Sequence, residues 1–188
     1  NLQTIASLLR LQMRRAKADE TKSVLRDCIS RVNSIAVVHE FLAQQGSGTV
    51  DMAAVAQGIY KAVLSGMAAP ELRLTTEFSA DNVVIPSEKA TSMALVLNEM
   101  LQNCFDHAFT GRTQGAISVE LKKTKNARPL TVCDDGNGLP PGFNGVPQSS
   151  LGLRIIKTMA EADLHGTFKI ENRPQGGTCA EVAIPLGG

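Results

Sequence analysis

Glu99, Asn103 and His107 lie four residues apart in the stretch "LVLNEMLQNCFDHAF", residues 95–109. This spacing places all three along one edge of a helix. A helix that only covered a core could use Lys, Arg or Gln along that border. A carboxylate, a carboxamide and an imidazole in one row at the rim of a packed face therefore need an explanation other than core packing. An apolar stripe beside the row contains Met93, Leu97, Met100, Cys104 and Ala108.

The stretch "CDDGNGLP", residues 133–140, places Asp134 and Asp135 where an apolar strand is predicted to end. A buried carboxylate only accepts hydrogen bonds, so Asp134 suits a ligand that offers an N–H donor, such as the exocyclic amine of adenine. Gly136 and Gly138 carry no side chain, which leaves room for a flat ring close to the backbone. A turn of the Asp-Gly type without any ligand is the alternative interpretation.

Two later segments also fit a nucleotide. "SSLGLRIIKTMAE", residues 149–161, places hydroxyl groups and Gly152 at the start of a predicted helix. Free N–H groups and the helix dipole favour a phosphate there, although an ordinary helix cap has the same residues. In "QGGTCAEVAIP", residues 175–185, the hydroxyl of Thr178 could lie beneath a bound base, or the glycine pair could serve only as a turn.

The start of the chain has the pattern of a helical hairpin. Apolar residues recur at alternating spacings of four and three over residues 1–17 and again over 21–44, which predicts two antiparallel helices. Two helices cannot bury both apolar seams, so we expect a second copy to complete a four-helix bundle. The alternative is a hairpin folded back on the rest of the chain.

The segment 44–48, "QQGSG", marks a predicted boundary between domains 1–45 and 49–188. Beyond it we expect helices over 51–66, 87–109 and 151–163, with Ser87 as the N-cap of the second. Strands are expected over 72–78, 115–123, 129–134, 166–172 and 178–185. Because the elements interleave without regular βαβ alternation, the expected fold is α+β, an α/β sandwich with a mixed β-sheet.

Composition excludes several classes of function. The net charge is +1 and aromatic residues make up 4% of the chain, so neither nucleic acid nor an anionic membrane is an expected partner. No apolar run is long enough for a membrane span. The four cysteines, Cys28, Cys104, Cys133 and Cys179, lack the close spacing of a metal site. We therefore expect reduced, buried thiols and a cytoplasmic location, which leaves open whether a longer parent protein is anchored in a membrane.

Together the motifs resemble those of bacterial two-component sensor histidine kinases, within the ATPase superfamily shared by gyrase, Hsp90-type chaperones and MutL. "LNEMLQNCFDHAF" is similar to the N box, and "DDGNGLP", "SSLGL" and "GGT" are similar to the glycine boxes of the Bergerat ATP-binding fold. "NLQTIASLLRLQ" and "RVNSIAVVHEFLAQ" resemble the dimerisation hairpin of the subgroup whose acceptor box reads His-Arg-Val-Lys-Asn-Asn-Leu-Gln.

The resemblance implies ATP and Mg²⁺ as ligands and assigns roles to the N-box residues. Asn103 would be a magnesium ligand, since a neutral oxygen donor leaves the other positions of the cation to phosphates and water. Glu99 would orient a magnesium-bound water or act as general base on the attacking imidazole. His107 would lie near the phosphates, or be a hydrogen-bonded histidine at the rim.

The glycine boxes would supply the nucleotide contacts. Asp134 would accept the adenine amine, while Asp135 is expected to be solvated. The remaining residues expected at the nucleotide are Gly136, Gly138, Ser150, Leu151, Gly152 and Thr178.

The sequence departs from the family pattern in two places. The second glycine box has one glycine, Gly152, which suggests a short, partly ordered lid over 139–150. The acceptor histidine is expected about five residues before Asn1. His39, followed by Glu40, is a possible substitute, but its position on the apolar seam of the second helix favours a packed side chain.

We therefore expect the core of a dimeric histidine kinase that transfers the γ-phosphoryl group of ATP to a histidine and then to an aspartate of a response regulator receiver domain. One alternative is a histidine phosphotransferase or docking scaffold of the same fold with an unused nucleotide site. Another is a serine kinase of the anti-sigma type, against which the helical hairpin argues.

Overall fold

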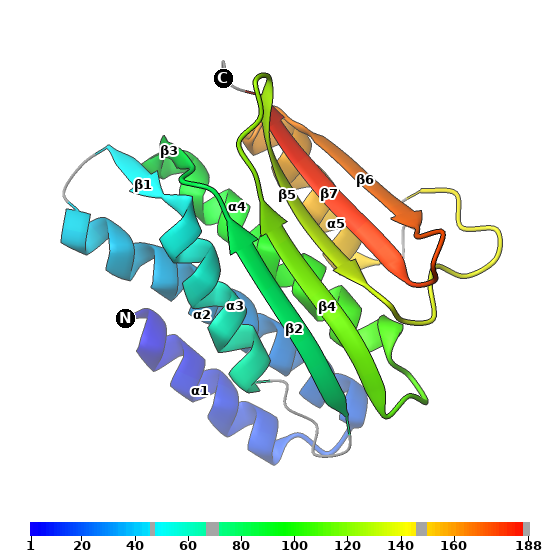
Figure 1. The fold of residues 1–188 in the computed structure, drawn as a ribbon. Helices are drawn as coiled ribbons and strands as arrows, with labels where there is room; N and C mark the ends of the chain where they lie inside the picture. The colour runs from blue at the N-terminus through cyan, green and yellow to red at the C-terminus, as the bar shows by residue number, and fades with distance from the viewer. Residues whose placement is uncertain (46–47, 67–71, 146–149, 186–188) are drawn as a thin grey trace.

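The protein begins with a helical hairpin, seen in a computed structural model that describes residues 1–45, 48–66, 72–145 and 150–185. Helix α1 spans Leu2–Arg15 and helix α2 spans Asp19–Gln45, so both helices predicted at the start of the chain are present. In Figure 1 the two helices run side by side and their far side is not covered by the β-sheet.

A five-stranded mixed sheet follows, with strand order β2-β4-β5-β7-β6. Strands β2 and β4 are parallel and the other neighbours are antiparallel. The predicted α+β class with a mixed sheet is thereby confirmed, and all five predicted strands are found. The strands are β2 (Arg73–Ala80), β4 (Gln114–Leu121), β5 (Ala127–Asp134), β6 (Thr167–Asn172) and β7 (Thr178–Pro185).

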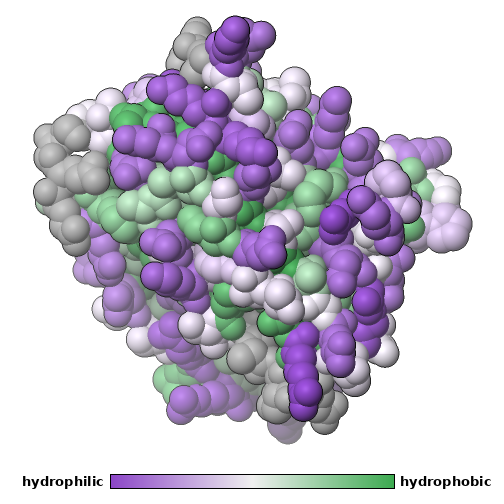
Figure 2. Space-filling view, viewed as in Figure 1, coloured by the Kyte–Doolittle hydropathy of each residue, from purple (hydrophilic) through white to green (hydrophobic). Residues whose placement is uncertain are grey.

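Helices cover one face of this sheet. Helix α4 (Ser87–Asn103) continues as a π-helical turn over Cys104–Ala108, and α5 (Leu151–Thr158) continues as another over Met159–Asp163. Helix α3 (Met52–Gly66) packs beside α4. Figure 1 shows the strands in front and α4 and α5 behind them, and Figure 2 shows polar and apolar side chains interspersed on the side turned to the viewer. The core therefore lies between the sheet and the helices.

A second, two-stranded sheet was not predicted. Strand β1 (Thr49–Asp51) pairs antiparallel with β3 (Val84–Pro86), and at three residues each these strands are too short for a periodic pattern to show. The expected N-cap of α4 was also wrong. Pro86 occupies that position, and the hydroxyl of Ser87 donates to the carbonyl of Gly48 instead. The Ser87 side chain therefore contacts the residue before β1 and caps no N–H group of α4.

Helix α2 packs against α3 and α4 within the same chain. Val38 is fully buried there, and Gly58 of α3 brings its backbone close to Val37 of α2. The folded-back arrangement is therefore present for α2. Helix α1 is different, because Ile5 and Leu8 are 46% and 58% exposed. The apolar face of α1 is left without cover in the single chain.

Two expectations about polar and sulfur side chains were wrong. Cys133 and Cys179 are register partners on β5 and β7, with Cα atoms 4.1 Å apart, and they form a disulfide rather than reduced thiols. Cys104 is a free, buried thiol and Cys28 a free, half-buried one. His39 is exposed rather than packed, because the face of α2 that meets α4 carries Ser34 and Val38. No helix of the described residues is long and apolar enough to cross a membrane.

Candidate nucleotide-binding site

A cavity of about 490 Å³ opens between the end of α4, strands β5 and β7, and the segment after β5. Its volume lies within the range of ordinary small-molecule sites. Six of the residues expected at a nucleotide line it: Asn103, His107, Asp134, Gly138, Ser150 and Thr178. Apolar side chains supply most of the remaining wall, among them Met100, Leu139, Phe143, Leu153 and Ile170. Ile170 lies on β6, far in sequence from the predicted motifs, so no local pattern pointed to it, whereas Leu139 and Leu153 lie within those motifs.

Asp134 ends strand β5 inside the cavity and is 3% exposed. Its Oδ1 accepts hydrogen bonds from the backbone N–H groups of Gly136 (2.8 Å) and Thr178 (3.1 Å). Its Oδ2 is contacted by the thiol of Cys104 at 3.8 Å. Burial, and then the neighbouring carboxylate, raise the pKa of that thiol, so Cys104 stays protonated. Asp134 is thus fixed through one oxygen and has acceptor capacity left on the other.

Gly136 and Gly138, which follow Asp134, lack a side chain for different structural reasons. Gly138 lines the cavity with φ +77°, and a Cβ atom there would come within 2.9 Å of the Asn172 Oδ1. Gly136 does not line the cavity, contrary to expectation. A side chain at Gly136 would overlap the backbone of Ala108, the last residue of the π-helical turn. The absence of a side chain at Gly136 therefore lets the loop pack against the end of the N-box helix, and it does not make room for the ring of a ligand.

Residues beyond the motifs hold this loop in place. The Asn172 Oδ1 accepts from the N–H of Leu139 at 2.7 Å, and Arg173 donates to the backbone carbonyl of Asp134 at 2.8 Å. The N–H of Asn137 donates to the carbonyl of Ala108 at 2.8 Å. Asn172 ends strand β6 and Arg173 follows it, both far from Asp134 in sequence, so no local pattern could have pointed to them.

Asp135 is more ordered than expected. Its Oδ1 accepts from the N–H of Ala116 on β4 at 2.7 Å, and its Oδ2 lies 4.0 Å from the guanidinium of Arg112. The side chain is 45% exposed. It therefore ties the end of β5 to β4, although it still reaches water.

Asn103 and His107 face the cavity from the N-box helix. Asn103 is half-buried, and within the described part of the chain its carboxamide makes no hydrogen bond. His107 is exposed at the rim, beside Asp106. An unpartnered carboxamide oxygen at the edge of a cavity fits a magnesium ligand, which prefers oxygen donors.

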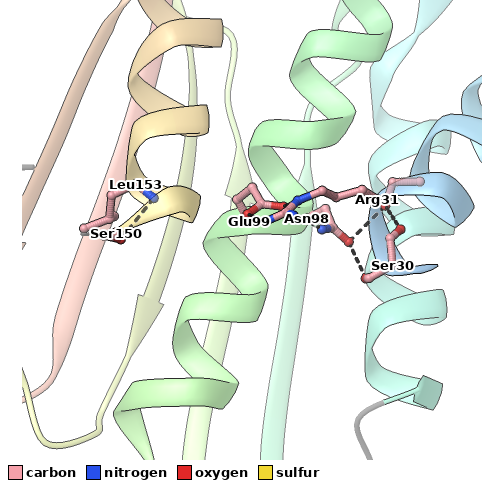
Figure 3. A network of polar contacts seen from close by, with 7 residues as sticks. Ser30, Arg31, Asn98, Glu99, Ser150 and Leu153 are labelled. Carbon is pink, nitrogen blue, oxygen red and sulfur yellow. Dashed lines mark hydrogen bonds and ion pairs between the residues drawn. The ribbon is translucent and has the colours of Figure 1, made fainter. Parts of the chain in front are cut away.

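Glu99 is 3% exposed and does not line the cavity. Arg31 of α2 holds it through two hydrogen bonds, from Nε to Oε1 and from the terminal nitrogen to Oε2, each 2.8 Å long. Asn98 adds a third donor, with Nδ2 3.1 Å from Oε1. The hydrogen bonds to Glu99 are the main cause that raises the pKa of Arg31, which thus remains a cation. Figure 3 shows this network between α2 and α4.

The start of α5 lies close to both N-box side chains. The hydroxyl of Ser150 caps the helix by accepting from the N–H of Leu153 at 3.4 Å, and Leu151 is 58% exposed. Gly152 lies so near the N box that a Cβ atom would be 3.1 Å from the Glu99 Oε2 and 3.4 Å from the Asn103 Oδ1. Residues 146–149 of the expected lid, Ser149 among them, fall outside the described residues.

Two more carboxylates accompany the contact between α2 and the N-box helix. Burial is the first cause that raises the pKa of Asp27 and of Asp106. The negative charge of Asp106 raises the pKa of Asp27 further. The charge of Glu99 raises the pKa of both Asp27 and Asp106. This contact therefore brings negative groups together, with Arg31 hydrogen-bonded among them.

Residues 1–67 match the family model described as histidine kinase, and residues 88–188 match that of the histidine kinase-, DNA gyrase B- and HSP90-like ATPases. The chain therefore belongs to this family of ATPases. The resemblance to a sensor histidine kinase core, inferred from the motifs, is confirmed.

Individual relatives agree with this assignment. The chain is 33% identical over all 188 residues to sensor histidine kinase PdtaS of Mycolicibacterium smegmatis and spans 38% of that protein. Among solved structures it is similar to the histidine kinase domain of the Erythrobacter litoralis EL346 blue-light activated histidine kinase, with a TM-score of 0.76 and 24% identity, covering 99% of this chain and 86% of the other. Histidine kinase AdeS of Acinetobacter baumannii gives a TM-score of 0.60 and 16% identity, covering 100% and 96%.

The chain spans under two fifths of the length of PdtaS. The solved structures share its fold. Membership of the ATPase family implies that the chain binds a nucleotide.

Proposed function

We propose that the chain is the catalytic core of a histidine kinase that binds ATP with Mg²⁺ and transfers the γ-phosphoryl group to a histidine. The observation that carries this proposal is the hydrogen bonding of the Asp134 carboxylate. One of its oxygens is fixed by two backbone N–H groups, while the other retains acceptor capacity in a cavity of nucleotide size. A carboxylate presented in this way fits the exocyclic amine of adenine.

The other predicted residues fit roles around such a ligand. Thr178 lies next to Asp134 in the wall of the cavity, where its hydroxyl could reach the base. Ser150 starts α5 at the same cavity, and free N–H groups at a helix start favour phosphate. Asn103 and His107 line the same cavity from the N-box helix and its π-helical turn. Mg²⁺ held by Asn103 would neutralise charge on the phosphates, so that this domain works by positioning and electrostatics.

We propose further that the hairpin 1–45 forms a homodimer and that 49–188 is the ATP-binding domain. The uncovered apolar face of α1 supports the first part. The phosphorylated histidine would then pass its phosphoryl group to an aspartate of a response regulator receiver domain, in the cytoplasm. A docking scaffold with an unused nucleotide site is the alternative, and the free acceptor capacity of Asp134 and Asn103 argues against it.

Calorimetric titration with ATP, with and without Mg²⁺, tests the nucleotide site directly. Asn103→Ala should weaken binding mainly when Mg²⁺ is present, because the lost group is a metal ligand. Equal weakening in chelator would assign Asn103 to the nucleotide or to the fold. A wild-type protein that binds no ATP under either condition would favour the scaffold.

The acceptor histidine is expected upstream of residue 1, but His39 is a second candidate because it is exposed on α2. Acid-labile labelling of the full-length protein with radioactive ATP decides between them. We expect His39→Ala to be labelled at the wild-type level. Loss of label in that variant would make His39 the acceptor.

A further inference from the structure

The polar contact between α2 and α4 has a consequence for Glu99, which rests on the proposed kinase function. Ser30 and Ser34 of α2 both donate to the Oδ1 of Asn98, at 2.7 Å and 3.0 Å. Asn98 in turn donates to Glu99, and Arg31 binds both oxygens of that carboxylate. Five side chains thus connect the hairpin to the N box in one continuous network (Figure 3).

Every donor to Glu99 in the described residues belongs to this network. Asn98, Ser34 and Glu99 are each at most 3% exposed, and the Arg31 side chain is 19% exposed. A buried carboxylate without a cation is strongly disfavoured, so the ion pair with Arg31 ties Glu99 to the position of α2. If the hairpin moved away from α4, Glu99 would lose its cation and become free to reorient.

The same network prevents Glu99 from accepting a proton from an incoming imidazole. Oε1 already accepts from Arg31 and Asn98, and Oε2 accepts from Arg31. On its remaining side Oε2 faces the first turn of α5, where even a Cβ atom on Gly152 would come within 3.1 Å. An acceptor histidine therefore has no approach to Glu99 in this arrangement.

We propose that Arg31 is an autoinhibitory latch on Glu99. The ion pair holds the ATP-binding domain against α2 in a resting arrangement, and phosphoryl transfer to histidine requires Arg31 to release the carboxylate. Movement of α2 relative to α4 would then control the N-box acid directly.

Arg31→Met in the full-length protein tests the latch, because Met keeps much of the side-chain length and removes the charge. Two readouts are measured: amide hydrogen exchange over 94–103 of α4, and the rate of acid-labile labelling from ATP. We expect faster exchange and a labelling rate about tenfold higher, the ratio that 1.4 kcal/mol produces. Arg26→Met is the matched control, since Arg26 is exposed on the same helix and is not hydrogen-bonded to Glu99.

ATP affinity separates this proposal from the proposed function. Arg31 does not line the cavity, so Arg31→Met should bind ATP with wild-type affinity. If the wild-type protein binds no ATP, the kinase assignment is refuted. The hydrogen-exchange result alone then decides whether Arg31 is a latch. Unchanged exchange, or a labelling rate equal to or below that of the wild type, would overturn the latch. If Arg31→Met does not fold, Arg31→Gln replaces it, because Gln removes the charge and keeps a hydrogen-bond donor for Glu99. A wild-type labelling rate in Arg31→Gln would equally refute the proposal.

Discussion

Asp134 and Glu99 are the two buried carboxylates of the described residues, and they are stabilised in different ways. Backbone N–H groups satisfy one oxygen of Asp134 and leave the other in the cavity. Side chains satisfy both oxygens of Glu99, and Arg31 of helix α2 supplies the cation. Asp134 therefore meets a ligand without rearrangement, whereas Glu99 requires a change of partner.

At the scale of one residue, Asp134→Asn should lower the affinity for ATP by about 1–3 kcal/mol, the usual cost of an unpaired buried polar group. Its oxygen would keep the two backbone N–H bonds, so the amide nitrogen would face the adenine amine as a second donor. Calorimetry measures the change directly.

Asp135→Asn is the matched control, because Asp135 bonds to Ala116 on β4 and does not line the cavity. It should bind ATP with wild-type affinity. A folded Asp134→Asn protein that also binds normally would remove Asp134 from the adenine site.

At the scale of an element, the turn between β6 and β7 positions Asp134 from outside its own strand. Gly177 has φ +84°, and a Cβ atom there would overlap the backbone carbonyl of Asp134. Gly176 has φ +99° with no atom within 4 Å. Both glycines have the left-handed backbone that other residues adopt at a cost, but only Gly177 also permits close packing against β5.

Gly177→Ala and Gly176→Ala therefore form a pair that separates backbone strain from packing. Gly176→Ala should cost about 1–2 kcal/mol of folding free energy, from the left-handed backbone alone. Gly177→Ala should cost more than that and should also weaken ATP binding, since relief of the overlap moves Asp134. Urea unfolding and calorimetry measure the two effects. Equal losses in both variants would contradict the packing role of Gly177.

Helices and strands were largely predictable because their periodic patterns are local. The N-box row predicted the helix that carries Glu99 and Asn103, and the end of an apolar strand predicted the place of Asp134. Contacts between distant segments were not predictable. The pairing of Cys133 with Cys179 depends on the register of β5 and β7, and the partner of Glu99 lies 68 residues away in α2. No spacing within either segment indicates that they meet.

At the scale of the whole molecule, the two helices of the hairpin have different neighbours. Helix α2 packs on α3 and α4 through Val38 and the Arg31 network, so its position is set within one chain. Helix α1 contacts α2 and leaves its other face to solvent. The exposed apolar residues on that face are Ile5, Leu8 and Leu11, at 46%, 58% and 45% exposure. In the homodimer proposed above, a second copy would cover these three residues in a four-helix bundle.

Leu8→Lys should therefore convert a dimer of the chain into a monomer, because a charge at the centre of this face would be buried without a partner in the bundle. Light scattering should give a mass near 20.0 kDa for the variant and twice that for the wild type at the same concentration. Val84→Lys is the matched control, since Val84 is an exposed apolar residue on β3, 46% exposed and remote from α1. That variant should remain dimeric. If Leu8→Lys also remains dimeric, the contact between copies lies elsewhere than on α1. If Val84→Lys alone is monomeric, the contact involves the ATP-binding domain.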